Sequence, residues 1–139
     1  MKRIITLLLT FVMVLSLCAC DTIPPEMNKD TYKVGKTALK VMDEHLSGGI
    51  DAAEAEKQLS VVYDEIVAVM NSIHPDPSSP TYVNEFEYAK TAKSVEYSIR
   101  HFVLGLRGEV DTIGKVPDLQ KTRDFLYNTL TGADLNKGL

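Results

Sequence analysis

Apolar residues recur at intervals of three and four along most of the chain, which is the spacing of amphipathic helices. From about Asp30 this spacing predicts a first helix, since charged residues occupy the intervening positions. Its expected apolar positions are Tyr32, Ala38, Leu39, Met42 and Leu46, and its polar positions include Lys33, Lys36, Lys40 and Glu44. Gly48 and Gly49 end it, because glycine accepts the left-handed conformation that closes a helix.

A second helix is predicted to begin after Asp51, because Asp51 and Glu54 have the spacing of a capping box. Its apolar positions are Ala55, Leu59, Val62, Ile66, Val69, Met70 and Ile73. A connection of about four residues to the first helix predicts that the two are antiparallel neighbours. The three prolines at positions 75, 77 and 80 then prevent the helix from continuing.

A third helix is predicted to begin with Ser79 as N-cap and Pro80 as first helical residue, and to run to about Arg107 before Gly108. A short fourth helix follows Asp118. Its apolar positions are Leu119, Phe125, Leu126 and Leu130, and Gly132 closes it. Without a convincing strand, the sequence predicts an all-α fold: a small antiparallel bundle of three long helices plus one short C-terminal helix over residues 30–139.

The third predicted helix has two apolar faces. One contains Tyr88, Ala92, Val95, Ile99, Phe102, Val103 and Leu106, and the other contains Tyr82, Phe86, Ala89, Tyr97 and Leu104, with His101 beside it. The first face is expected to form core, and the fourth helix is expected to cover the second face from Tyr97 to Leu104. At 1.5 Å per residue the fourth helix reaches about 20 Å, whereas the second face runs about 33 Å. The start of that face is therefore expected to stay uncovered.

The uncovered start of this face lies beside the proline loop. We therefore expect an exposed apolar patch used for contact, formed by Pro75, Pro77, Tyr82 and Phe86 and called here the proline–aromatic patch. An equally open alternative is that the loop, or the segment containing Pro24 and Pro25, folds over these side chains.

The beginning of the chain has the layout of a secretory signal. A basic start at Lys2 and Arg3 is followed by a mainly apolar run from Ile4 to Leu17 and then by small residues and cysteine. Crossing a bilayer takes about 20 apolar residues, so this run is better interpreted as a removable segment than as a membrane span.

Leu17-Cys18-Ala19-Cys20 resembles the lipobox of bacterial lipoproteins. The resemblance implies cleavage after Ala19 and a diacylglycerol thioether on Cys20, which anchors the domain on the extracytoplasmic side of the cell membrane. Cys18 is the rival acceptor, but bulky Leu17 would then precede the cleavage site. An ordinary signal peptide with incidental cysteines is the alternative. The predicted organisation is a signal peptide at 1–19, a lipidated, extended, proline-stiffened spacer without a core at 20–29, and the helical domain at 30–139.

The charge balance disfavours a nucleic-acid partner. The chain has 15 basic and 19 acidic residues, and loss of Lys2 and Arg3 with the signal leaves 13 basic residues and a net charge of −6. We expect the lysines to be scattered among carboxylates, without a polybasic patch for anionic lipid. With Cys18 removed and Cys20 acylated, no cysteine remains for a disulfide, a thiolate metal site or a nucleophile.

No catalytic motif is found. His45, His74 and His101 have no second histidine or cysteine at metal-ligand spacing, and Asp43-Glu44-His45 is expected to be a solvated helix face. We expect no metal, no cofactor and no catalytic residue. The sequence favours a non-enzymatic binding or scaffolding lipoprotein with an envelope protein as partner. The alternatives are a small-molecule or metal-binding lipoprotein serving an envelope transporter or enzyme, and an enzyme whose site is not visible in sequence.

Overall fold

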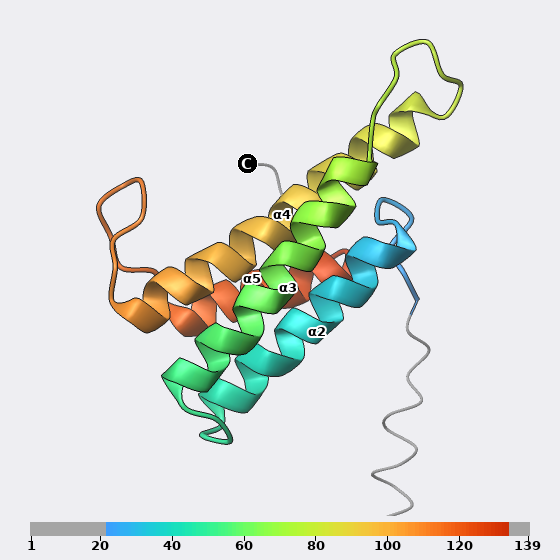
Figure 1. The fold of residues 1–139 in the computed structure, drawn as a ribbon. Helices are drawn as coiled ribbons and strands as arrows, with labels where there is room; N and C mark the ends of the chain where they lie inside the picture. Colours follow the sequence, from blue (N-terminus) through green and yellow to red (C-terminus); the bar gives the residue numbers. More distant parts are fainter. Residues whose placement is uncertain (1–21, 134–139) are drawn as a thin grey trace, which may run out of the picture.

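The computed structural model describes residues 22–133, which form four helices and, within that range, no strand (Figure 1). The all-α class predicted from the sequence is confirmed for this part of the chain. The predicted signal at 1–19, the predicted lipid-bearing Cys20 and the last six residues of the predicted domain lie outside the described residues.

Helices α2 (Lys29–Leu46) and α3 (Ala52–Ser72) each begin at a side-chain cap. Asn28 Oδ1 accepts a hydrogen bond from the Thr31 backbone N–H at 2.7 Å, and Asp51 Oδ1 accepts one from the Glu54 N–H at 2.8 Å. Such caps satisfy backbone donors that the first helical turn leaves unpaired. The predicted cap at Asp51 is therefore confirmed, and Gly48 after α2 has the expected positive φ, +80°.

Helix α4 (Tyr82–Arg107) begins two residues later than Pro80, so the predicted start is wrong. Ser79 accepts hydrogen bonds from the backbone N–H groups of Thr81, through its side chain at 3.2 Å, and Tyr82, through its carbonyl at 3.1 Å. These bonds make residues 79–82 a separate turn, and Thr81 becomes the N-cap. The end is as predicted, since Gly108 closes the helix with φ +66°.

Helix α5 (Leu119–Thr131) packs against α4 and α2. The Phe125 ring lies edge-on to Tyr97, with 6.0 Å between ring centroids, and Gly105 is close enough to Leu119 that a Cβ would lie 2.6 Å from its Cδ2. The fourth helix therefore contacts this end of α4, as predicted, but it does not cover the whole predicted face, since Tyr97 is 43% exposed and Leu104 lines a pocket between α3 and α4.

The core lies where the four helices meet. Its fully buried large side chains include Met42, Leu59, Ile66, Val95, Ile99, Phe102 and Leu126. The predicted core face of α4 is buried at its centre, while Tyr88, Val103 and Leu106 at its margins are half-buried. The predicted face of α3 behaves in the same way, since Val69 and Met70 pack against the core from its edge. Ile73 also packs there, but it follows the helix as its extended C-cap instead of belonging to it as predicted.

The segment before α2 is part of the fold, which corrects the expectation of an extended spacer without a core. Met27 is 3% exposed and belongs to the core, Pro24 is buried, and Ile23 packs against the core. The Thr91 hydroxyl of α4 donates a hydrogen bond to the Glu26 carbonyl at 3.0 Å, and the Met27 N–H donates one to the Pro24 carbonyl at 2.9 Å. The Met27–Pro24 hydrogen bond closes a turn, and the side chains of Ile23, Pro24 and Met27 on either side of it are wholly or partly buried.

The helices place the connecting segments at two ends of the molecule (Figure 1). The segment before α2 and residues 73–81 lie toward one end, and the connections 47–51 and 108–118 lie at the other. Residues 73–81 and the adjoining turns of α3 and α4 extend beyond the start of α2. The proline–aromatic patch lies on this extension.

Candidate functional site

The proline–aromatic patch is largely open to solvent. Phe86 is 51% exposed and Pro77 is exposed, while Pro75 and Tyr82 are half-buried. The rings of Tyr82 and Phe86 lie 6.2 Å apart between centroids. The segment before α2 meets α4 at Thr91, and neither this segment nor the proline loop covers Phe86. The alternative in which one of them folds over Phe86 therefore does not hold.

Val83 enlarges this surface and was missed in the sequence. Its side chain is 71% exposed on the first turn of α4, beside Tyr82. The helical spacing of 100° per residue places it outside both predicted apolar faces, in line with His101, so periodicity gave no reason to single it out.

The loop that carries Pro75 and Pro77 is held by its own hydrogen bonds. Asp76 Oδ1 accepts from the Ser78 backbone N–H at 2.9 Å and from its hydroxyl at 2.7 Å, and these bonds lower the pKa of Asp76. Glu85 Oε1 accepts from the Thr81 hydroxyl at 2.6 Å, and Glu85 Oε2 from the Asp76 N–H at 3.3 Å. The patch is therefore presented on an ordered loop joined to the first turn of α4.

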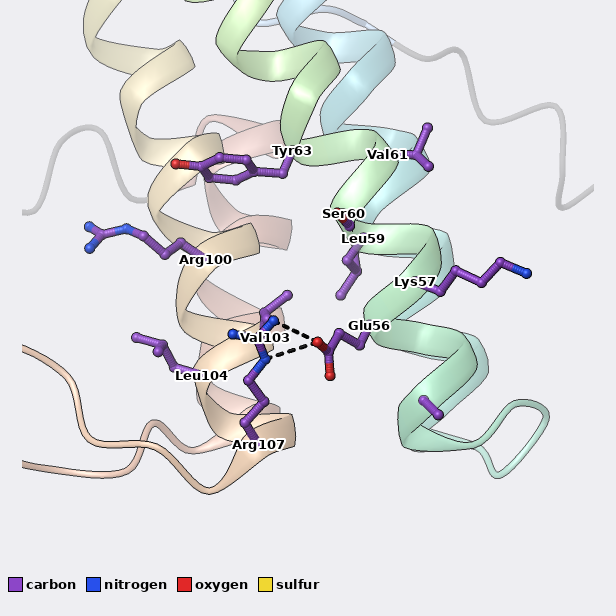
Figure 2. Close-up of a pocket in the computed structure, with 11 residues that line it drawn as sticks. Glu56, Lys57, Leu59, Ser60, Val61, Tyr63, Arg100, Val103, Leu104 and Arg107 are labelled. Atoms are coloured by element: carbon purple, nitrogen blue, oxygen red, sulfur yellow. Dashed lines mark hydrogen bonds and ion pairs between the residues drawn. The ribbon is translucent and has the colours of Figure 1, made fainter.

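A second surface is an open pocket of about 840 Å³ between α3 and α4 (Figure 2). Leu59, Val103 and Leu104 contribute apolar side chains, and Lys57, Arg100 and Arg107 contribute cations. Arg107 donates to Glu56 Oε1 from Nε at 2.9 Å and from Nη2 at 2.6 Å, which joins the two helices and raises the pKa of Arg107. The sequence did not indicate this pocket, because its lining comes from the margins of two helices.

A nearly buried carboxylate lies beside this pocket. Glu96 is 5% exposed and accepts a hydrogen bond from the Tyr63 hydroxyl at 3.2 Å. Its oxygens also lie 3.2 Å from Arg100 Nε and 3.4 Å from Lys93 Nζ. Burial raises the pKa of Tyr63, and the neighbouring Glu96 charge raises it further. The arrangement joins α3 to α4 and balances the Glu96 charge with two cations.

The connection 108–118, called here the distal loop, exposes three further apolar side chains: Val110, Ile113 and Val116. Asp111 organises it, since its Oδ1 accepts from the backbone N–H groups of Ile113 at 2.9 Å and Lys115 at 3.1 Å. Asp111 Oδ2 lies 3.9 Å from Nε2 of buried His101. The Lys115 N–H is the main cause of a lowered Asp111 pKa, with smaller contributions from Ile113 and His101.

Asp43, Glu44 and His45, predicted to form a solvated helix face, each contact a different partner. Asp43 binds Arg123 of α5, with 2.6 Å from Oδ1 to Nε, while Glu44 lies 3.8 Å from Lys40. His45 Nδ1 lies 3.2 Å from the Ile50 carbonyl oxygen. Within residues 22–133, no three histidine, cysteine, aspartate or glutamate side chains gather in a way that could hold a metal ion.

The lysines of α2 are not scattered as expected from the composition. Lys29, Lys33, Lys36 and Lys40 are all exposed and lie within about 60° of arc at 100° per residue. This lysine face is opposite the buried face of α2, which contains Ala38 and Met42. Ile23, from the segment before α2, lines the same shallow depression as the four lysines. The spacing i, i+4, i+7, i+11 was visible in the sequence but was outweighed by the net negative charge.

Comparisons with known proteins find no matching family model, no matching curated protein and no matching solved structure. Within the described range, none of the four helices combines the length and apolar character needed to span a bilayer. The site must therefore be interpreted from its own geometry.

Proposed function

We propose that this protein is a cell-envelope lipoprotein, anchored through acylated Cys20 on the extracytoplasmic side of the membrane. Its domain is a non-enzymatic binding or scaffolding module that meets an envelope protein. We also infer that the domain is an antiparallel bundle of three long helices and one short one, as the short connection between α2 and α3 favours.

The observation that carries the binding role is the exposure of Phe86 and Val83 beside an ordered proline loop. Exposed apolar side chains contribute little to the stability of their own chain, but they gain free energy when a partner removes them from water, at about 25 cal/mol per Å². Aromatic side chains on a rigid support are frequent anchors of protein interfaces. The proline–aromatic patch, enlarged by Val83, is therefore the proposed contact surface.

The anchor is tested by comparing Cys20→Ser with Cys18→Ser in cells. We expect Cys20→Ser to block acylation and release the protein from the washed membrane fraction. Cys18→Ser is the matched control and should be retained like the unchanged chain, because Cys18 leaves with the signal. Retention of Cys20→Ser in its unacylated form, or dependence on Cys18, contradicts the proposed anchor.

The contact surface is tested with a photo-crosslinking amino acid at position 86 in intact cells. A discrete adduct with an envelope protein is expected, and it should weaken when Tyr82 and Val83 are changed to serine. Position 65, an exposed glutamate on α3, is the control and should not give that adduct. Equal adducts at both positions, or none at 86, contradict the proposal.

The α3–α4 pocket favours a second candidate function, the capture of a small organic ligand for an envelope transporter or enzyme. An apolar lining with a few charged groups at the edge is typical of ligand sites. A ligand that copurifies with the protein and is lost in Val103→Trp, which fills the pocket, would favour this candidate over the protein-binding role.

A further inference from the structure

We propose that the lysine face of α2 is the side on which the domain rests against its own membrane, with the lysine ammonium groups at anionic phospholipid headgroups. This inference rests on the proposed acylation of Cys20. It adds to the anchor a definite protein surface, a class of lipid and an orientation of the domain.

Only a short stretch of chain lies between the proposed anchor and the fold. Because Ile23 already packs against the core, only Asp21 and Thr22 separate Cys20 from the folded domain. A fully extended chain advances at most about 3.6 Å per residue, so the Cys20 Cα lies within about 11 Å of the Ile23 Cα. The domain cannot stand away from the bilayer, and some part of its surface near Ile23 must face the headgroups.

The surface that lies near Ile23 is the lysine face. Ile23 borders the depression that the four α2 lysines line. The face runs from Lys29 to Lys40, about 16 Å along the helix at 1.5 Å per residue. The surface that the short connection brings to the membrane is therefore the surface on which the lysines gather.

The charge of the lysine face favours the same orientation. Lysines close to an anionic leaflet are attracted to it, and an acyl anchor combined with a basic surface is an effective pair of membrane signals. The other described faces carry most of the acidic residues of a domain whose net charge is −6 after signal removal. Acids do approach this face near its C-terminal end, but Asp43 there is bound to Arg123 and Glu44 lies beside Lys40. An anionic surface thus attracts this face and repels the more acidic ones.

The orientation has a consequence for the proposed contact surface. With the lysine face on the headgroups, the buried face of α2 and the rest of the bundle lie on the side away from the bilayer. The proline–aromatic patch then extends past the start of α2 and stays open to an envelope protein.

The test uses the full acylated protein reconstituted into vesicles. Since acylated Cys20 has no free thiol, a cysteine introduced in Thr37→Cys is the only site for a thiol-reactive fluorophore, and it lies beside the lysine face. Quenching by headgroup-labelled nitroxide lipid is measured in phosphatidylcholine vesicles with and without phosphatidylglycerol. Val61→Cys, exposed on α3 at the α3–α4 pocket, is the matched control position.

We expect phosphatidylglycerol to increase quenching at position 37 and not at position 61. High salt should reverse the increase, because the Debye length falls from about 10 Å at 0.1 M to about 3 Å at 1 M. Changing all four α2 lysines to glutamine should reduce quenching at position 37 to the level at position 61. The same change at Lys57, Lys90, Lys115 and Lys121 alters the net charge equally and should leave the quenching at position 37 unchanged.

Equal quenching at both positions, or no dependence on phosphatidylglycerol, overturns the proposed orientation. A loss of quenching in both lysine variants also overturns it, because net charge and not the α2 face would then be responsible. Failure of the anchor itself is distinguishable, since the unchanged protein would then not remain on vesicles of either composition.

Discussion

At the scale of single residues, two glycines mark where helices approach closely. A Cβ on Gly105 would lie 2.6 Å from Leu119 Cδ2 and 2.8 Å from the Pro117 carbonyl oxygen. A Cβ on Gly35 would lie 2.5 Å from Leu130 Cδ2. The difference is that Gly105 meets backbone, whereas Gly35 meets only the end of a side chain that can change rotamer.

Gly105→Ala is therefore expected to lower the free energy of unfolding by about 1–3 kcal/mol, the usual range for overpacking. Gly35→Ala should be less harmful, since Leu130 can move and alanine is better in a helix than glycine by about 1 kcal/mol. Urea denaturation of the two variants measures both effects. A larger loss for Gly35→Ala would contradict the packing described for α4 and α5.

The lowered pKa of Asp111 predicts that the stability of the fold depends on pH. The N–H groups of Lys115 and Ile113, together with His101, lower its pKa in the fold. A lowered folded pKa stabilises the fold above the pKa of the unfolded carboxyl, near 3.8, and that contribution disappears as the pH falls through the folded value. The stability difference between the unchanged protein and Asp111→Asn should thus shrink below pH 3.8 in thermal unfolding followed by circular dichroism. A difference that grows on acidification would reverse the assigned sign.

At the scale of helices, the start signals differ in strength. Asp51 caps α3 through a bond to the Glu54 N–H, whereas Thr81 makes no side-chain bond to the α4 backbone. Asp51→Ala should cost about 1 kcal/mol of unfolding free energy. Thr81→Ala is the control and should cost less than half of that. Similar losses in chemical denaturation of the two variants would show that the cap at Asp51 has no special role.

These local signals also explain how much of the fold could be predicted. The bounds of α2, α3 and α5 follow from signals that act within a few residues: side-chain caps at their starts, glycines after α2 and α5, and the proline-rich segment after α3. The start of α4 was placed too early because the Ser79 hydroxyl accepts a bond from Thr81 in a turn instead of capping the helix. Whether the Ser79 hydroxyl bonds within the turn or caps the helix depends on the path of the whole 73–81 loop.

The candidate surfaces also differ in whether the sequence could predict them. Phe86 was predicted to be exposed because helix lengths alone leave that end of α4 uncovered. Val110, Ile113 and Val116 were missed, since exposure in an irregular loop has no periodic signature. The α3–α4 pocket was also missed, because its lining depends on how far Val103 and Leu104 remain open after packing.

At the scale of the whole molecule, the segment before α2 connects the proposed anchor to the core. Met27 is almost fully buried, and Glu26 bonds to Thr91 of α4. Met27→Ala should therefore destabilise the whole domain by about 2–5 kcal/mol, as expected for a truncated core side chain. Met70→Ala, at the half-buried margin of α3, should cost less in the same urea denaturation experiment. Unchanged stability in Met27→Ala would instead support the prediction that residues 20–29 form an extended spacer outside the core.

The intact mass of the mature protein purified from membranes tests the central claim most directly, because tethering at Cys20 underlies both the proposed function and the proposed orientation. We expect a chain that begins at Cys20, lacks residues 1–19 and carries the added mass of a diacylglycerol group on that cysteine. A mature chain with an unmodified Cys20, or one that still begins at Met1, would contradict it.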